Sequence, residues 1–287
     1  MEKIILITGA SSGIGRDAAL KLAGQGHRVY AAARRTDKLD ELREEFAERT
    51  EKASGKCKPG SILPLALDIT DEASIEAAVE TIIQKEGHID VLVNNAGFGY
   101  FGPIETVPIE EARKQLDVNI FGLASLTKKV LPFMRQNGGG RIINISSIAG
   151  RITVPFGGWY NISKYAVEAF SDALRMEVKP YGIKVSIIEP GGIKTAWGGI
   201  AADHLEESAA GSVYEERAGR FARTIRKGYG GNLLSPASRI ANAISRATNA
   251  RRPKLRYRTG TGAHSGVFFH AILPARWWDA IICRFLA

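Results

Sequence analysis

Cysteine is scarce in this sequence: the 287 residues include only Cys57 and Cys283, which lie far apart. Two distant cysteines form neither a disulfide framework nor a metal-binding cluster, so we expect no metal site and a reducing, cytoplasmic environment. Long apolar runs are also missing, because none reaches the roughly 18 residues that a membrane span requires. The first strand-like run, 3–8, starts close to the initiator methionine, which leaves no room for a signal peptide.

Acidic residues are in deficit. The chain has 30 Asp and Glu against 39 Lys and Arg, so its formal net charge at pH 7 is +9. Much of the excess lies in 217–230 and 251–258. No nucleic-acid motif accompanies these arginines, so we expect no nucleic-acid partner and interpret most of them as solvated surface. Attraction of an anionic cofactor or substrate is a second interpretation.

Strand-like and helical patterns alternate along the chain. We predict a single domain over 1–287, because a chain of this length with 45% hydrophobic residues can bury one large core. Helical spacing is clearest in 71–86, 110–136 and 161–180. The strand-like runs are 3–8, 28–33, 61–67, 90–95, 140–146, 183–189 and 254–258. This alternation predicts a doubly wound α/β fold whose mostly seven-stranded parallel sheet carries helices on both faces.

Two internal segments depart from this alternation. Residues 49–60 are polar and rich in turn-forming residues, so we predict an exposed loop that carries no chemistry. Residues 196–232 form a long, charged and glycine-rich stretch. Loops of that length in compact domains are often functional, so we predict a substrate-binding loop or lid there.

The chain ends in an amphipathic tail over 265–287. We expect a helix from Pro274, with its apolar residues on one side. These residues are Trp277, Trp278, Ile281, Ile282 and Phe285. Such a helix packs on its own domain or on a sister subunit, and peripheral membrane contact is the alternative.

A glycine-rich turn follows the first strand-like run. Gly9, Gly13 and Gly15 stand in "TGASSGIG", directly before a helical pattern. Glycine lets the backbone turn sharply and approach a ligand, and the N-terminus of the following helix attracts negative charge. At the start of a βαβ series this motif predicts a Rossmann-like, dinucleotide-binding unit, whereas a turn without a ligand is the alternative.

An acidic residue is missing where the second strand ends. NAD-binding units place Asp or Glu about 20 residues after the glycines to bind the ribose 2′-hydroxyl. Here the strand ends in Ala33, Arg34 and Arg35. Arginines favour a 2′-phosphate, so we predict NADP(H) rather than NAD(H), with ordinary surface arginines as the alternative.

A tyrosine and a lysine form the candidate catalytic pair. Tyr160 and Lys164 stand four residues apart in "WYNISKYAV", and on a helix this spacing puts them on one face. An unperturbed tyrosine has a pKa near 10, and a nearby ammonium group lowers that pKa toward neutrality. Ser147 lies upstream in "NISSIAG". Tyr160 is thus a possible acid with Lys164 as the group that tunes it, and a solvated helix face is the alternative.

These motifs together resemble those of the short-chain dehydrogenase/reductases. Further matches are Asp68 in "LDIT", "NNAG" at 94–97, Asn119 in "LDVNIFG" and "PGGIKT" at 190–195. The matches follow the family's order from residue 8 to residue 195. The stretch "NNAGFGYFGP" and the extended tail are most similar to the hydroxysteroid and retinol dehydrogenase branch.

The resemblance implies an oxidoreductase that transfers hydride between NADP(H) and a carbonyl or secondary alcohol. Tyr160 would be the general acid or base, and Lys164 would hold the nicotinamide ribose and lower the tyrosine pKa. Ser147 would bind the substrate oxygen, and Asn119 would hold a water molecule beside Lys164. The implied cofactor-binding residues are Gly9, Ser11, Ser12, Gly13, Ile14, Gly15, Arg34, Arg35, Asp68, Ile69, Asn94, Ala96, Gly97, Tyr160, Lys164, Pro190, Gly191, Ile193 and Thr195.

Aromatic residues gather in three stretches expected at the carboxyl ends of strands, where open α/β sheets bind ligands. They predict an apolar pocket for a bulky small molecule, steroid-like, retinoid-like or aryl, although aromatic residues also fill cores. The candidate substrate-binding residues are Phe98, Tyr100, Ser147, Phe156, Trp159 and Trp197.

The sequence leaves two alternative functions open. An NAD-linked alcohol dehydrogenase is the alternative enzyme, and a catalytically idle dinucleotide-binding regulator is the alternative outside catalysis. Members of the resembled family pair through the helices that correspond to 110–136 and 161–180. We therefore expect a homodimer or homotetramer.

Overall fold

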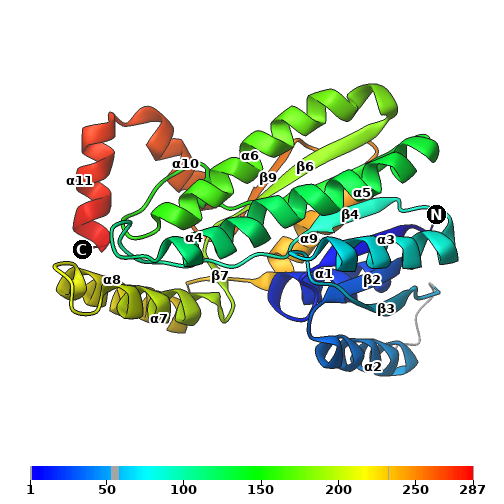
Figure 1. Cartoon of the computed structure of the whole chain (residues 1–287), viewed down its shortest axis with the longest axis horizontal. Helices are drawn as coiled ribbons and strands as arrows, with labels where there is room; N and C mark the ends of the chain where they lie inside the picture. Colours follow the sequence, from blue (N-terminus) through cyan, green and yellow to red (C-terminus); the bar gives the residue numbers. More distant parts are fainter. Residues whose placement is uncertain (1, 53–57, 232, 287) are drawn as a thin grey trace.

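The computed structural model describes residues 2–52, 58–231 and 233–286, and within them seven strands form one sheet (Figure 1). The strands follow the order β3-β2-β1-β4-β5-β6-β9, and every neighbouring pair is parallel. They are β1 (Ile4–Thr8), β2 (Arg28–Ala33), β3 (Ser61–Ala66), β4 (Val91–Asn94), β5 (Gly140–Ile145), β6 (Ile183–Pro190) and β9 (Arg256–Thr259). The predicted doubly wound parallel sheet is confirmed.

Helices cover both faces of this sheet (Figure 1). One face packs against α1 (Gly13–Ala23), α2 (Thr36–Lys52) and α9 (Ala237–Asn249). The other packs against α3 (Glu72–Glu86), α5 (Leu123–Gln136) and α6 (Gly158–Val178). The short helix α4 (Ile109–Leu116) precedes α5. The fold is therefore a three-layer sandwich.

The central strand β1 shows why the sequence folds this way. All five of its residues are buried. Ile5 and Ile7 contribute to the core with α1, α2 and α9, whereas Ile4 and Leu6 contribute to the core with α3, α5 and α6. Alternate residues of a strand point to opposite faces, so a strand buried on both faces must be apolar throughout.

The strand order reverses between β1 and β4, so the loops after these strands separate at the carboxyl edge of the sheet. A crevice for ligands forms at such a switch point. The loop after β1 is the glycine-rich turn, and the loop after β4 begins with Asn95. The topology alone therefore brings two of the predicted motifs to one crevice.

The stretch 196–232 differs from the predicted loop. It folds as two helices, α7 (Trp197–Ala209) and α8 (Glu215–Gly230), which pack on one another and follow the short strand β7 (Ile193–Lys194). Both helices are amphipathic: their buried side chains form one apolar cluster. The charged residues that indicated a loop lie on the solvated faces, whereas Gly198 is buried against Tyr229. β7 pairs with β8 (Ser235–Pro236), which leads into α9.

The tail forms α10 (Ala263–Ile272) and α11 (Ala275–Leu286), so a helix does follow Pro274. Its two tryptophans do not share one environment: Trp278 is 7% exposed, whereas Trp277 is 66% exposed. Trp278 and Ile282 pack against α10 and the loop after β5, while Ile281 is exposed. The Phe285 side chain lies outside the described part of the structure. Among the described residues, no helix has the length and apolar character to cross a bilayer.

The stretch 49–60 is only partly a loop. Residues 49–52 form the last turn of α2, and residues 58–60 lead into β3. Residues 53–57, which include Cys57, lie outside the described residues.

Candidate active site

The glycine-rich turn takes backbone conformations that side chains disfavour. Gly9 has φ 65° and Gly13 has φ 54°, both in the left-handed region. A Cβ atom at Gly9 would lie 2.9 Å from the Ala96 Cα, so the two loops touch through their backbones. α1 starts at Gly13 with Ser12 as its N-cap, and no side chain caps it. Free N–H groups of the first turn therefore face the crevice.

Gly15 has a structural function rather than a place in the crevice wall. A Cβ atom there would lie 2.5 Å from both the Gly9 carbonyl oxygen and the Asn95 Nδ2. That Nδ2 donates to the Thr8 carbonyl oxygen at 2.9 Å and to the Gly9 carbonyl oxygen at 3.2 Å. Gly15 thus makes room for the amide that joins β1 to β4. Gly15, predicted as a cofactor-binding residue, is not among the residues that line the cavity.

The arginines after β2 lie next to the glycine-rich turn at one end of the crevice. Arg35 Nη2 donates to Ser11 Oγ at 3.0 Å, and it lies 3.5 Å from Ser12 Oγ. Thr70 hydrogen bonds lower the pKa of Asp68, and Arg34 lowers it further. Two guanidinium groups and the start of α1 therefore make this end of the crevice strongly attractive to phosphate.

The catalytic pair comes from one face of α6. Lys164 Nζ lies 5.8 Å from the centroid of the Tyr160 ring, and it donates to the Ile145 carbonyl oxygen at 3.0 Å. Lys164 is only 7% exposed. A Cβ atom at Gly97 would lie 3.6 Å from this Nζ, so the loop after β4 passes close to the ammonium group.

Burial controls the ionisation of both groups. Burial raises the pKa of Tyr160 to about 12, although the neighbouring Ser147 hydroxyl opposes the change. Burial also lowers the pKa of Lys164 to about 8, and the Glu168 carboxylate opposes that change. Removing a charged form from water favours the neutral form. In the protein without ligand, the tyrosine is therefore held as a phenol at neutral pH. A lowering of the Tyr160 pKa by Lys164 stays a prediction.

Ser147 begins a short 3-10 turn, Ile148–Gly150, after β5. Its Oγ accepts from the Ala149 N–H at 3.1 Å and lies 3.5 Å from the Pro190 carbonyl oxygen. The neighbouring Ser146 is 2% exposed and points at the backbone of α6 instead. Both serines line the cavity, and Ser147 is the more exposed of the two.

Asn119 lies in a π-helical turn, Asp117–Gly122, which interrupts the helix predicted over 110–136. Its Oδ1 accepts from the Phe98 N–H at 3.0 Å, and its Nδ2 donates to the Phe98 carbonyl oxygen and the Ser163 Oγ. Both Nδ2 hydrogens and one of the two acceptor positions of Oδ1 are therefore used, and the side chain holds the loop after β4.

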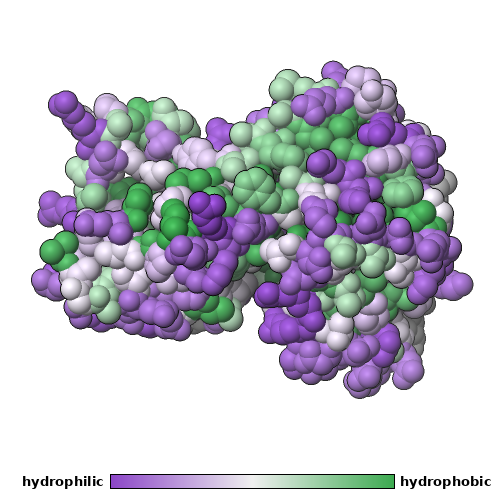
Figure 2. Space-filling model, viewed as in Figure 1, coloured by the Kyte–Doolittle hydropathy of each residue, from purple (hydrophilic) through white to green (hydrophobic). Residues whose placement is uncertain are grey.

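The crevice is a cavity of about 1190 Å³ that continues from the arginine end to the catalytic pair. In the space-filling view the surface is indented between the side of α7 and α8 and the side of α2 (Figure 2). Predicted residues that line this cavity are Gly9, Ser11, Ser12, Gly13, Ile14, Arg34, Arg35, Asp68, Ile69, Ala96, Gly97, Phe98, Ser147, Tyr160, Lys164, Pro190, Gly191, Ile193, Thr195 and Trp197. The residues that sequence motifs connect therefore meet in one place.

Four other predicted residues point elsewhere. Asn94 lies within the sheet and donates to Thr127 Oγ1 and Asn144 Oδ1, and the neighbouring Asn95 faces the cavity. Tyr100 stacks on His204 with ring centroids 4.4 Å apart. Trp159 packs beside Tyr100, and Phe156 packs against Phe221. Asn94, Tyr100, Phe156 and Trp159 are therefore not among the residues that line the cavity.

Residues from three elements enclose the tyrosine in an apolar pocket. Trp197 lies 5.3 Å from Tyr160 and 5.5 Å from Phe101 between ring centroids. Tyr229 of α8 lies 6.0 Å from Trp197. Wall residues that sequence reasoning missed are Asn95, Phe101, Ile152, Val154, Ile200 and Tyr229. Phe101 stands in the aromatic stretch already singled out, whereas no local signal connects Tyr229 with Tyr160.

Comparisons with known proteins agree with this geometry. Residues 3–204 match the family model described as short chain dehydrogenase. The chain is 35% identical to the probable short-chain type dehydrogenase/reductase VdlC of Helicobacter pylori, over 96% of this chain and 95% of that protein. It is 39% identical to the 3-ketodihydrosphingosine reductase of Bacteroides thetaiotaomicron, over 78% of this chain and 75% of that protein.

A solved short-chain dehydrogenase from Streptomyces avermitilis has a TM-score of 0.77 and 32% identity, covering 94% of this chain and 92% of that one. The chain belongs to the short-chain dehydrogenase/reductase family. It is therefore an oxidoreductase with a fold that binds a nicotinamide dinucleotide. The residues present fit such a ligand, because the glycine-rich turn, the N-terminus of α1 and two arginines lie around the place for its phosphates.

Proposed function

We propose that the protein is an NADP(H)-dependent oxidoreductase that interconverts a carbonyl group and a secondary alcohol on a bulky apolar substrate. One observation carries the proposal. A partly buried phenol, Tyr160, lies beside Ser147 and Lys164 at the apolar end of a cavity whose other end carries Arg34 and Arg35. Hydride chemistry is supplied by the nicotinamide, and the protein positions and protonates the substrate.

The arginine end supports NADP(H). The 2′-phosphate of NADP carries extra negative charge, which guanidinium groups bind through short, charge-assisted hydrogen bonds. Arg35 is already held by Ser11, so little side-chain entropy would be lost on binding. No carboxylate stands at the end of β2 to bind a ribose hydroxyl instead.

The catalytic end supports proton donation to a carbonyl. Because the pKa of Tyr160 is raised to about 12, the hydroxyl is protonated at neutral pH. That is the form that gives a proton to the oxygen of a substrate undergoing reduction. Ser147 presents its Oγ beside Tyr160, so a substrate oxygen can contact both hydroxyl groups. Lys164 places positive charge behind them, which stabilises negative charge as it develops.

The pocket wall supports a bulky apolar substrate. Phe101, Trp197, Ile200 and Tyr229 surround the space next to Tyr160. An apolar wall gives affinity through buried area, and the two hydroxyl groups at its end fix the orientation. One relative, the Bacteroides protein, is named for 3-ketodihydrosphingosine, and this supports a keto group on an apolar compound.

A substrate panel tests the proposal. Purified protein is mixed with NADPH or NADH and a series of steroid-like, retinoid-like and aryl ketones, and nicotinamide absorbance is followed. Turnover should be faster with NADPH and should fall by at least about 1,000-fold in Tyr160→Phe. NADPH affinity should change little, because the phosphate end is intact.

The alternatives predict different results. Equal kcat/KM with NADH would favour an NAD-linked dehydrogenase. Coenzyme binding without turnover of any substrate would favour an idle regulator. Undiminished turnover in Tyr160→Phe would exclude the proposed role of the phenol.

We also propose self-association through α5 and α6, in the cytoplasm. These helices carry exposed large apolar residues, namely Phe121 just before α5 and Ile162, Tyr165 and Met176 on α6. Figure 2 shows apolar side chains gathered over this part of the surface. Scattered apolar residues need no partner, but a contiguous patch favours one. A monomer mass by light scattering would contradict the assembly.

A further inference from the structure

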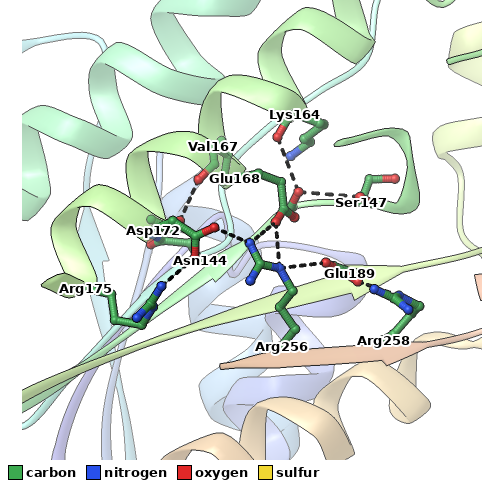
Figure 3. A network of polar contacts seen from close by, with 12 residues as sticks. Asn144, Ser147, Lys164, Val167, Glu168, Asp172, Arg175, Glu189, Arg256 and Arg258 are labelled. Carbon is green, nitrogen blue, oxygen red and sulfur yellow. Dashed lines mark hydrogen bonds and ion pairs between the residues drawn. The ribbon is translucent and has the colours of Figure 1, made fainter. Parts of the chain in front are cut away.

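A cluster of charged side chains lies beneath the active site (Figure 3). It contains three carboxylates and three guanidinium groups, from Glu168, Asp172 and Arg175 of α6, Glu189 of β6, and Arg256 and Arg258 of β9. We call it the carboxylate–guanidinium cluster. Arg256 is its centre, because this one side chain contacts all three carboxylates.

Glu168 is the member of the cluster nearest the catalytic lysine. It follows Lys164 by one turn of α6, so the two side chains share a face of the helix. Glu168 is 6% exposed. Its Oε2 accepts from Arg256 Nε at 3.1 Å, and its Oε1 has no hydrogen-bond partner among the described residues. Burying a carboxylate with one unpaired oxygen lowers the stability of the folded protein.

The loop that carries Ser147 packs tightly on this part of α6. A Cβ atom at Gly150 would lie 2.7 Å from the Lys164 carbonyl oxygen and 3.0 Å from the Glu168 Cγ. The Ser146 hydroxyl lies 3.4 Å from the same carbonyl oxygen. Close packing keeps bulk water out, so the charge on Glu168 acts on Lys164 through a poorly screening interior.

Few other charges face Lys164. Neutral groups surround its ammonium: Tyr160 on α6, the Ile145 carbonyl oxygen of β5, Gly97 after β4 and the Asn119 side chain of the π turn. The Glu168 carboxylate raises the pKa of Lys164, whereas burial lowers it. Among the described residues, Glu168 supplies the negative charge that opposes the effect of burial on Lys164.

The pKa of Glu168 is raised overall, and Arg256 is the member of the cluster that favours its ionised form. Burial raises the pKa of Glu168 and the nearby Glu189 raises it too, whereas Ser146 and Arg256 lower it. Glu189 is itself paired with Arg258 at 2.6 Å, and Asp172 also contacts Arg175. The two other carboxylates that contact Arg256 are therefore each paired with a second guanidinium group, Asp172 with Arg175 and Glu189 with Arg258.

From this geometry we propose that Glu168 is a positioning residue for catalysis: its buried carboxylate, clamped by Arg256 from the last strand, keeps Lys164 in the charged ammonium form. The inference rests on the proposed function only in giving Lys164 a catalytic role. The ionisation of Lys164 can be measured whether or not a substrate is known.

Glu168→Gln tests the proposal in the full-length protein. The variant keeps the side-chain shape and removes the charge. The readout is the pH dependence of Lys164 acetylation by acetic anhydride, quantified by peptide mass spectrometry, because only the neutral amine reacts. We expect the midpoint to fall by about one pH unit, as removal of a nearby opposite charge lowers an amine pKa.

Asp172→Asn is the matched control. It removes the same charge and also loses a contact with Arg256, which donates to Asp172 Oδ2 at 2.5 Å. Asp172 lies two turns beyond Lys164 and its side chain is 35% exposed, so solvent screens its charge. The acetylation midpoint should stay within about 0.3 units of the wild-type value. An equal shift in both variants would overturn a specific role for Glu168.

Activity gives a second readout. With a substrate in hand, the alkaline limb of the kcat/KM profile should move to lower pH in Glu168→Gln and stay in place in Asp172→Asn. A thermal melt shows that each variant is folded. An unchanged Lys164 midpoint in folded Glu168→Gln overturns the inference. Absence of turnover by the wild-type protein would instead contradict the proposed function.

Discussion

Arg35 donates a hydrogen bond from Nη2 to Ser11 Oγ over 3.0 Å, and this contact joins the end of β2 to the glycine turn after β1. The guanidinium is therefore held in place before any ligand arrives. Its neighbour Arg34 lies close enough to Asp68 to lower the pKa of that carboxyl. Both arginines line the same end of the cavity.

Replacing Arg34 and Arg35 together by Ala should weaken NADPH binding by about 10- to 100-fold, because charge-assisted hydrogen bonds to a phosphate are lost. NADH affinity should change less than about threefold, since NADH has no 2′-phosphate. Fluorescence titration of each coenzyme measures both constants. Arg43→Ala, on the exposed side of α2, is the control and should leave both unchanged. A parallel loss for the two coenzymes would show that the arginines do not select between them.

Gly15→Ala should destabilise the protein. The added methyl group would lie 2.5 Å from the Gly9 carbonyl oxygen, and forcing such an overlap costs about 1 to 3 kcal/mol. Gly199→Ala on α7 is the matched control, because no atom lies within 4 Å of its Cβ position. In a helix this change is neutral or stabilises by up to about 1 kcal/mol. Urea unfolding measures both, and equal midpoints would contradict the close packing at Gly15.

Lys164→Met should stabilise the protein at neutral pH. The pKa of Lys164 falls to about 8 in the folded state from 10.5, so the folded protein loses a proton before the unfolded chain does. Wild-type stability therefore rises with pH through the window from about 8 to 10.5. Below that window the buried charge costs about 3 kcal/mol, less about 1 for the hydrogen bond to Ile145.

Urea unfolding at pH 7 and at pH 10.5 checks this prediction. The variant should gain about 2 kcal/mol at the lower pH, and the gain should vanish at the higher one. Catalysis should be lost at both. A variant less stable than wild type at pH 7 would show that burial of the ammonium is not costly.

Local patterns in the sequence predicted most of the site. The β1 turn and the Tyr160–Lys164 pair each lie within a few residues of chain, where spacing alone decides which groups share a face. In two places the motif indicated the wrong one of two neighbouring residues. Asn94 hydrogen-bonds within the sheet whereas Asn95 lines the cavity, and Tyr100 stacks on His204 whereas Phe101 lines the cavity. A motif does not reveal which neighbour faces the cavity.

The stretch 196–232 was harder to predict for another reason. Glycines and charges in 196–232 suggested a loop, yet α7 and α8 form because their small apolar faces pack on one another. Such helices depend on tertiary contacts more than on intrinsic propensity. Tyr229 reaches the cavity only through this packing, so a sequence pattern could not connect it with Tyr160.

β9 follows α6 and β6 in the chain, so its arginines are synthesised after the carboxylates with which they pair. By the time α6 and β6 have left the ribosome, Glu168 and Glu189 are present without the arginines that they need. Those partners are translated later, and unpaired carboxylates resist burial until then. A chain that stops before residue 256 would therefore contain every motif of the cofactor and proton-transfer site, but Glu168 and Glu189 beneath that site would lack Arg256 and Arg258.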